Sequence, residues 1–233
     1  MTNKIKKERC LAIIPARSGS TRVKDKNFIK FFGKKMYEHT YLAAKKSNLF
    51  TDIVISTDKK SIKKHKIKQN YERPLSLCRN SSDLADVVMH ALRYYEKKYN
   101  KKYDYICLLW ATSPLRSERD IVNSFEKLKK KKANAIIGVT EYYLYPGCAI
   151  KFDKKGFLTP LTPKLFWLSS QERPEIFADC GSFSWIKRDT FLKEKSWFPK
   201  KSISYALPYF KGVDLDEPKH LELLSFYYKK YKR

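Results

Sequence analysis

The sequence predicts an α/β protein in which a mostly parallel sheet lies between two layers of helices. Two observations lead to this fold class. Short apolar runs alternate along the chain with segments of helical periodicity, which is the pattern of crossover helices that link parallel strands. Several of these runs are apolar at every position rather than at every second one, as expected for strands that helices cover on both faces.

Six segments have the character of strands, because each is short, rich in apolar residues and bounded by polar or turn-forming residues. In chain order they are Leu11 to Ile14, Ile53 to Thr57, Tyr105 to Trp110, Ala135 to Val139, Ser182 to Ile186 and Ser202 to Leu207. The first four are interleaved with helices and form the predicted parallel core of the sheet.

Four segments are predicted to be amphipathic helices, because their apolar residues recur at three- and four-residue spacing. They are Tyr37 to Ser47, Asp83 to Tyr99, Glu118 to Lys130 and Pro218 to Tyr231. In the second of these, His90 shares the apolar face with Val87 and Ala91. We therefore interpret His90 as a core histidine rather than a catalyst.

The segment from about Glu141 to Ala178 has a different pattern, in which prolines and glycines separate short aromatic stretches. These residues are Pro146, Gly147, Gly156, Pro160, Pro163 and Pro174. Such spacing is typical of hairpins and loops rather than of further strand–helix–strand units. We expect one domain over residues 1–233 with this segment as an embedded excursion, and a dimerisation arm is one use for it.

Composition limits the classes of protein to consider. No apolar segment reaches membrane-spanning length, and the polar start with an early Pro15 does not resemble a signal peptide, so a cytoplasmic location is expected. The five cysteines are odd in number and scattered without a C-x-x-C pair. They suit reduced core thiols better than disulfides or a metal site.

The formal net charge of +26 raises the alternative of a nucleic-acid-binding protein. Much of the lysine lies in runs such as Lys129 to Lys132, which suit solvated helix faces and ends. No RNA-recognition or C₂H₂ motif accompanies the charge. The same charge would equally attract a nucleotide or an acidic sugar, and no nucleic acid is expected as partner.

The segment Leu11 to Asn27 carries the first candidate site, because an apolar strand ends there in a loop of small residues and cations. Such a loop can turn its N–H groups toward an anion. The small residues are Ala16, Ser18, Gly19 and Ser20, and the cations are Arg17, Arg22, Lys24 and Lys26. The segment has one glycine, fewer than the Walker A or G-x-G-x-x-G patterns require, so an ordinary solvated basic loop remains the alternative.

The second candidate site is the acidic motif Asp214-Leu215-Asp216-Glu217-Pro218, which precedes the last helix. Alternation places Asp214 and Asp216 on one side of an extended segment, where their carboxylates can share one hard cation. The alternative is that Asp216 or Glu217 caps the helix, with Pro218 in its first turn.

Six motifs occur in the order and approximate spacing of the acylneuraminate cytidylyltransferases, the CMP-sialic acid synthetases and their relatives. They are IIPARSGSTRVKDKN from Ile13, ISTD from Ile55, ERP from Glu72, LLWATSPLR from Leu108, DCGSFSW from Asp179 and VDLDEP from Val213. The resemblance extends from Leu11 to Leu224 and is weakest in the excursion. It implies a three-layer, Rossmann-like nucleotidyltransferase fold and a homodimer.

The resemblance also implies an activity: magnesium-dependent transfer of CMP from CTP to the anomeric hydroxyl of an acidic nine-carbon α-keto sugar, with release of pyrophosphate. No nucleophilic side chain is needed, since positioning and charge neutralisation carry phosphoryl transfer. The two alternatives within nucleotidyltransferases are an enzyme for Kdo, whose opening motif normally lacks the Lys26-Asn27 pair, and one for a sugar 1-phosphate.

Site residues follow from the same resemblance. Those with catalytic roles are Arg17, Lys26 and Asp216. The acceptor's proton could be taken by a metal-bound hydroxide or by an aspartate, for which Asp216 is the weaker choice. Nucleotide binding is assigned to Ala16, Arg17, Ser18, Gly19, Lys26, Asn27 and Arg73. Sugar binding is assigned to Arg116, Gln171, Asp179 and Gly181, and Mg²⁺ to Asp214 and Asp216.

The chain departs from the family pattern at several positions. Trp110 and Ala111 stand where relatives commonly carry Gln and Pro, and Ser169 and Ser170 precede Gln171 where relatives often carry arginine. The segment DCGSFSW is closer to the pseudaminic acid branch than to the Asn-Gly-Ala of sialic acid synthetases, so a pseudaminic-type acid is the favoured acceptor.

Overall fold

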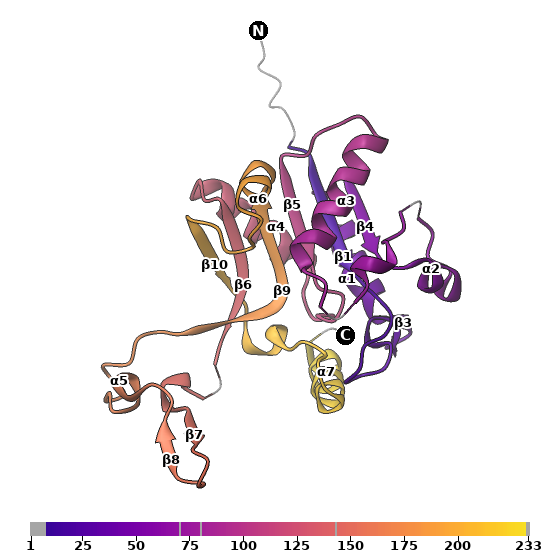
Figure 1. Ribbon diagram of the computed structural model, residues 1–233. Helices are drawn as coiled ribbons and strands as arrows, with labels where there is room; N and C mark the ends of the chain where they lie inside the picture. Colours follow the sequence, from indigo (N-terminus) through magenta and orange to yellow (C-terminus); the bar gives the residue numbers. More distant parts are fainter. Residues whose placement is uncertain (1–7, 70, 80, 143, 232–233) are drawn as a thin grey trace.

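The computed structural model describes residues 8–69, 71–79, 81–142 and 144–231 of the 233-residue chain. A six-stranded sheet forms its centre, in the order β10 (Ser202–Ala206), β6 (Ala135–Glu141), β9 (Phe177–Lys187), β5 (Tyr105–Leu109), β1 (Cys10–Pro15) and β4 (Asp52–Ser56). β9 pairs antiparallel with both β5 and β6, and the other pairs are parallel. The predicted α/β class with a mostly parallel sheet is confirmed (Figure 1).

Helices cover both faces of this sheet. The side chains of β1 alternate, so Ala12 and Ile14 join one hydrophobic cluster while Leu11 and Ile13 join another. The first cluster is closed by α1 (Met36–Ser47) and α4 (Glu118–Lys130), and the second by α3 (Leu84–Lys98) and α6 (Arg188–Glu194). The strand is buried on both faces, which explains why its sequence is apolar at every position.

Capping residues define where several helices begin. The Ser117 and Asp120 side chains form a reciprocal capping box at the start of α4, and the Asp83 carboxylate accepts a hydrogen bond from the Ala85 N–H at the start of α3. The predicted helices agree with the observed ones to within one residue at each end. No periodicity predicted α2 (Lys59–His65), α6 or the short hairpin of β2 (Lys30–Phe31) and β3 (Lys34–Lys35).

The last helix, α7 (Pro218–Tyr231), packs against the N-terminal half of the chain. Leu215 and Leu224 are fully buried in a third cluster with Phe31 and Met36. The Tyr228 ring meets the Phe31 ring edge-on, with the ring centroids 5.2 Å apart. This packing brings the acidic motif ahead of α7 next to the loop that follows β1.

Between β6 and β9 the chain leaves the sheet as an arm, which contains β7 (Ile150–Phe152), β8 (Leu158–Pro160) and α5 (Pro163–Phe166). Figure 1 shows the arm extending away from the body of the molecule. Several of its large apolar side chains are exposed, namely Tyr142, Leu144, Ile150, Phe152, Phe157, Leu158, Leu161 and Trp167. Such a concentration of exposed apolar surface is typical of an interaction site.

The five cysteines are all free. Cys10, Cys107 and Cys180 are buried, and burial raises the pKa of the Cys180 thiol to about 12. Cys148 is exposed on the arm, so the prediction of core thiols does not hold for this cysteine.

His90 shares a hydrogen bond of 2.9 Å with the Tyr71 hydroxyl, which agrees with its interpretation as a structural histidine. Among the described residues, no helix has both the length and the apolar composition needed to cross a membrane.

Candidate active site

Three cavities adjoin one another near the ends of β1 and β5. The acidic cavity, of about 470 Å³, is lined by residues that include Asp179, Asp214 and Asp216. The Arg73 cavity, of about 170 Å³, is lined by Arg73, Asn27 and neighbours. The loop cavity, of about 250 Å³, is formed by residues 17–26 together with Asp216.

The three cavities share wall residues and therefore form one continuous site. Arg17 and Lys26 line both the Arg73 cavity and the loop cavity. Asp216 lines both the loop cavity and the acidic cavity, and Trp110 lines both the acidic cavity and the Arg73 cavity. The predicted cationic loop and the predicted acidic motif thus meet in space.

The loop after β1 is held by its own polar groups. Gly19 has a φ of +77°, in the left-handed region that glycine tolerates best, and this allows the chain to turn. The Arg17 guanidinium donates hydrogen bonds of 3.2 Å to the carbonyls of Ser18 and Gly19. The Asn27 side chain donates to the Arg17 carbonyl at 2.9 Å, so Asn27 fixes the base of the loop as well as lining the Arg73 cavity.

Two backbone groups of this loop have hydrogen-bond partners within the protein. Ala16 is fully buried, and its N–H donates to the Ser56 carbonyl at 2.9 Å, so it faces the neighbouring strand rather than a cavity. The Ser18 N–H and hydroxyl both donate to the Asp58 carboxylate, at 3.4 and 3.1 Å. The Ser18 amide is therefore used to anchor the loop rather than to bind an anion.

Asp58 is the anchor of that loop and the N-cap of α2. Its carboxylate also accepts hydrogen bonds from the Ser61 N–H at 2.8 Å and the Ser61 hydroxyl at 2.9 Å. Burial opposes ionisation, but the hydrogen bonds from Ser61 and Ser18 outweigh it and lower the pKa of Asp58. An ionised Asp58 thus ties together α2 and the cationic loop.

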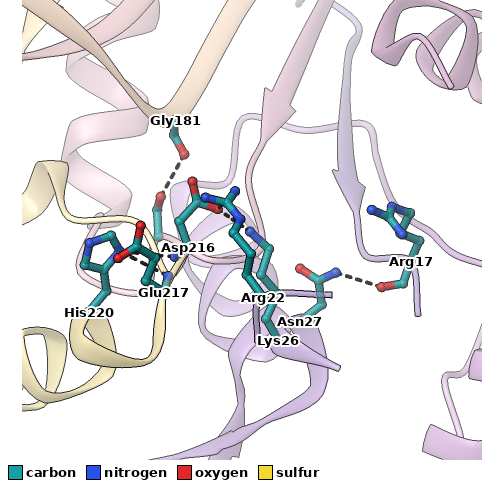
Figure 2. A network of polar contacts seen from close by, with 9 residues as sticks. Arg17, Arg22, Lys26, Asn27, Gly181, Asp216, Glu217 and His220 are labelled. Carbon is teal, nitrogen blue, oxygen red and sulfur yellow. Dashed lines mark hydrogen bonds and ion pairs between the residues drawn. The ribbon is translucent and has the colours of Figure 1, made fainter. Parts of the chain in front are cut away.

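Lys26 and Arg22 both pair with Asp216. The Lys26 ammonium lies 2.7 Å from the Asp216 carboxylate, and the Arg22 guanidinium lies 3.1 Å from it. Figure 2 shows the two cationic side chains converging on this carboxylate. Partial burial would raise the pKa of Asp216, but the hydrogen bond and the charge of Lys26, with the charge of Arg22, lower it. Asp216 is therefore an ionised counterion to two cations.

Asp214 has a different environment from Asp216. It lines the acidic cavity, and its Oδ1 atom is buried without a hydrogen-bond partner among the described residues. Burial and, to a lesser extent, the Asp216 charge raise the pKa of Asp214 against the opposing effects of Thr112 and Lys26. A buried carboxylate oxygen with no donor is an open position for a cation.

Arg73 is buried in the wall of the cavity named after it. Its guanidinium donates to the carbonyls of Ser56 and Leu77, and its backbone N–H donates to the Thr57 carbonyl at 2.8 Å. Its Nε atom is buried without a partner among the described residues. Burial lowers the pKa of the Arg73 guanidinium. These contacts hold the cation rigidly at the cavity wall, next to Arg17.

Two of the predicted sugar-binding residues, Asp179 and Gly181, line the acidic cavity. The Gly181 φ is +56°, its N–H donates a hydrogen bond to the Asp179 carboxylate at 3.0 Å, and its carbonyl accepts a hydrogen bond from the Ser113 hydroxyl at 2.8 Å. A Cβ atom at position 181 would lie 3.7 Å from the Asp214 carboxylate, which is an ordinary contact distance, so the positive φ rather than a lack of space favours glycine here.

The other two predicted sugar-binding residues are not brought to the cavity walls. Arg116 is 1% exposed, and its guanidinium is bonded to the Ser182 carbonyl and, at 2.9 Å, to the Thr40 hydroxyl. It connects β9 to α1 and lines none of the three cavities. Gln171 is exposed on the arm, which projects from the body (Figure 1), and lines none of the three cavities.

Several wall residues were not predicted. His220 lines the acidic cavity, and its Nδ1 atom accepts from the Asp216 and Glu217 N–H groups at 3.3 and 3.4 Å. Arg22 was named as a cation of the loop, but its pairing with Asp216 was not predicted, because the two residues lie far apart in the sequence. The remaining unpredicted wall residues include Ser20, Thr21, Leu77, Arg79, Ser82, Thr140, Tyr209 and Leu223.

Comparison with curated proteins gives relatives along almost the whole chain. The chain is 28% identical over 223 residues to the pseudaminic acid cytidylyltransferase of Campylobacter jejuni, covering 94% of this chain and 96% of that protein. It is 28% identical to the CMP-N,N'-diacetyllegionaminic acid synthase of Legionella pneumophila, covering 90% and 92%. It is 26% identical to the N-acylneuraminate cytidylyltransferase of Streptococcus agalactiae, covering 88% of this chain and 50% of that protein.

Solved structures share the fold at lower sequence identity. A CMP:2-keto-3-deoxy-manno-octonic acid synthetase complexed with CTP superimposes with a TM-score of 0.68 at 14% identity, covering 95% of this chain and 99% of that one. The 4-diphosphocytidyl-2C-methyl-D-erythritol synthase of Anaerococcus prevotii gives a TM-score of 0.62 at 13% identity, with the same coverage. These matches confirm the predicted nucleotidyltransferase fold.

A family model provides the remaining comparison, and its match includes the cationic loop, Arg73 and Trp110. The model is that of the cytidylyltransferases, and it matches residues 11–160, more than half of the chain. The chain therefore belongs to the cytidylyltransferase family.

Proposed function

We propose that this enzyme transfers CMP from CTP to the anomeric hydroxyl of a nonulosonic acid, with release of pyrophosphate. One observation carries the proposal: three adjoining cavities meet at Lys26, Asp216 and Trp110, which gives room for a base, a triphosphate and an acceptor side by side. The names of the curated relatives, which act on pseudaminic, legionaminic or N-acylneuraminic acids, support the same acceptor class.

The cavities suggest where each part of CTP lies. The Arg73 cavity suits the cytidine, since Asn27 and Ser82 offer polar groups and Leu77 and Val87 offer apolar surface. The loop cavity suits the triphosphate, because Arg17, Arg22 and Lys26 line it. The acidic cavity is the largest of the three, and we assign it to the acceptor sugar.

In this arrangement the chain acts by positioning and by charge. Lys26 lies at the junction of the Arg73 and loop cavities, where its ammonium can stabilise negative charge that develops on the α-phosphate. Arg17 occupies the same junction. Asp216 keeps Lys26 and Arg22 in place before CTP binds, and it faces the acidic cavity, from which it can accept the acceptor's hydroxyl proton.

The acidic motif fits a divalent cation, for which we propose Mg²⁺. Asp214 offers a buried carboxylate oxygen with no donor, and Asp216 lines the same cavity. Within the described ranges no group of three or more His, Cys, Asp or Glu side chains could hold a metal alone, so phosphate oxygens and water would complete the shell, as Mg²⁺ prefers. When bound, Mg²⁺ would neutralise phosphate charge and polarise the α-phosphate.

We further propose that the enzyme works as a homodimer in the cytoplasm. The observation that supports the dimer is the set of exposed apolar side chains on the arm, among them Phe152, Leu158 and Trp167. A second copy of the arm is the simplest partner for such a surface, because one copy would cover the same patch on the other.

The test is a pyrophosphate-release assay with CTP, Mg²⁺ and a panel of pseudaminic, legionaminic, sialic and Kdo acids. We expect release with at least one nonulosonic acid, and most with the pseudaminic type. Release only with a sugar 1-phosphate, or only with Kdo, would move the enzyme to another substrate class. Tight, steeply salt-dependent binding to generic DNA without thermal stabilisation by CTP would contradict the proposal altogether.

A further inference from the structure

Trp110 occupies a special position between two parts of the site. It follows directly after β5, and among the described residues it is the one that lines both the acidic cavity and the Arg73 cavity. Under the proposed function, these two cavities hold the acceptor and the cytidine. Trp110 is therefore a wall residue that the two cavities share.

The peptide groups of Trp110 are held on both sides. Its N–H donates to the Ser182 carbonyl on β9 at 3.2 Å, and its carbonyl accepts from the Thr40 hydroxyl on α1 at 3.1 Å. The segment after β5 has left the regular sheet, so these two contacts replace the ladder that would otherwise hold it.

Arg116 contacts the same two groups that hold the Trp110 peptide. Its guanidinium donates to the Ser182 carbonyl and, at 2.9 Å, to the Thr40 hydroxyl. Because the Thr40 oxygen accepts from Arg116, its own proton is directed to the Trp110 carbonyl. Burial lowers the pKa of Arg116 to about 10, which still leaves the guanidinium protonated at neutral pH.

We propose that Trp110 fixes the relative placement of the cytidine and the acceptor, and that Thr40 and Arg116 are positioning residues which act through the Trp110 peptide. This inference rests on the proposed function. It gives the fully buried Arg116 a role in the reaction without any contact to a substrate, and it makes Thr40, on a helix outside the three cavities, part of the support for catalysis.

Steady-state kinetics on Trp110→Ala, Thr40→Val, Thr40→Ser and the double variant test the inference. Trp110→Ala removes the indole from the wall that the two cavities share, so it should raise the KM for both CTP and the acceptor about two- to tenfold. Thr40→Val removes the bridging hydroxyl and should raise both KM values in the same direction, whereas Thr40→Ser keeps the hydroxyl and should restore values close to those of the parent.

The double variant is the sharpest measurement. If Thr40 acts through Trp110, Thr40→Val adds nothing once the indole is gone, so the double variant should match Trp110→Ala. Additive effects, or a Thr40→Ser variant as impaired as Thr40→Val, would overturn the inference while leaving the proposed function intact. Absence of pyrophosphate release by the parent enzyme with every acid would overturn both.

Arg116→Lys provides a second route if Thr40→Val is too unstable to purify. A lysine ammonium lacks the planar fork that reaches two acceptors at once. We expect the same rise in both KM values, again without further effect when combined with Trp110→Ala. An Arg116→Lys variant that unfolds at a lower temperature but keeps the parental KM values would show a purely structural role and overturn the inference.

Discussion

The Lys26 ammonium and the Asp216 carboxylate lie 2.7 Å apart although 190 residues separate them in the sequence. This pair joins the cationic loop after β1 to the acidic motif before α7. Arg22 pairs with the same carboxylate, but its side chain is 61% exposed while that of Lys26 is 23% exposed. The two cations should therefore contribute unequally to activity, because solvent screens the exposed pair more strongly.

Replacing the two cations by methionine tests that inequality. Lys26→Met should lower kcat/KM for CTP about a hundredfold, since it removes a cation at the cavity junction, whereas Arg22→Met should lower it only a few fold. Lys24→Met is the matched control, because Lys24 is exposed in the same loop and lines none of the three cavities. Equal losses for all three variants would mean that activity depends on the total positive charge of the loop rather than on the positions of Lys26 and Arg22.

Asp214→Asn separates activity from stability. The variant keeps the shape of the side chain and removes a buried carboxylate. Burial raises the pKa of this carboxylate, which means that its charged form is disfavoured in the folded protein, so the melting temperature should stay the same or increase. Pyrophosphate release should fall by at least about a hundredfold, because the amide is a poor ligand for a divalent cation. Thermal unfolding and initial rates measure the two effects. Retained activity would exclude Asp214 as a metal ligand.

Asp58 should make the folded protein sensitive to acid. Its pKa is lowered in the folded state, so its contribution to stability is complete above the unfolded value of about 3.9 and is lost as the pH falls through the lower folded value. Asp58→Asn should abolish that part of the pH dependence. Urea unfolding between about pH 7 and pH 3 measures it. Glu222→Gln, on the exposed side of α7, is the control and should follow the parent curve.

The arm should control the oligomeric state. Leu158→Glu or Trp167→Glu places a charge on the exposed apolar surface, and either change should convert the dimer to a monomer because a charge in that contact would be desolvated without a partner. Light scattering after size exclusion gives the mass. Phe198→Glu, an equally exposed apolar position outside the arm, should leave the mass unchanged. A parent chain that elutes only as a monomer would refute the proposed dimer.

Much of the fold follows from local sequence. α4 and α7 begin and end where the periodicity of their apolar residues predicts, because this signal is encoded within one helix. β9 was predicted in part, but not its antiparallel direction. That direction depends on the path of the arm between β6 and β9, which no local pattern reports. α2 was missed because its many lysines hide any apolar stripe, although Asp58 caps it.

For the candidate site, the sequence identified several wall residues but not the position of every side chain. Lys26, Asn27, Arg73 and Asp214 all line the cavities, and each belongs to one of the motifs on which the family resemblance rests. The burial of Arg116 was not predicted, because a motif does not tell whether its arginine faces solvent or the protein interior.

The meeting of residues 17–27 with residues 214–220 also has a consequence for how the enzyme is made. During synthesis the cationic loop emerges first, and about 190 further residues must follow before Asp216 can join it. A nascent chain can form β1, α1 and β4 through local contacts, but its active site closes only when α7 docks on the N-terminal half. Premature termination within the last helix therefore yields a chain that contains both the cationic loop and Asp216 but lacks the packing that brings them together.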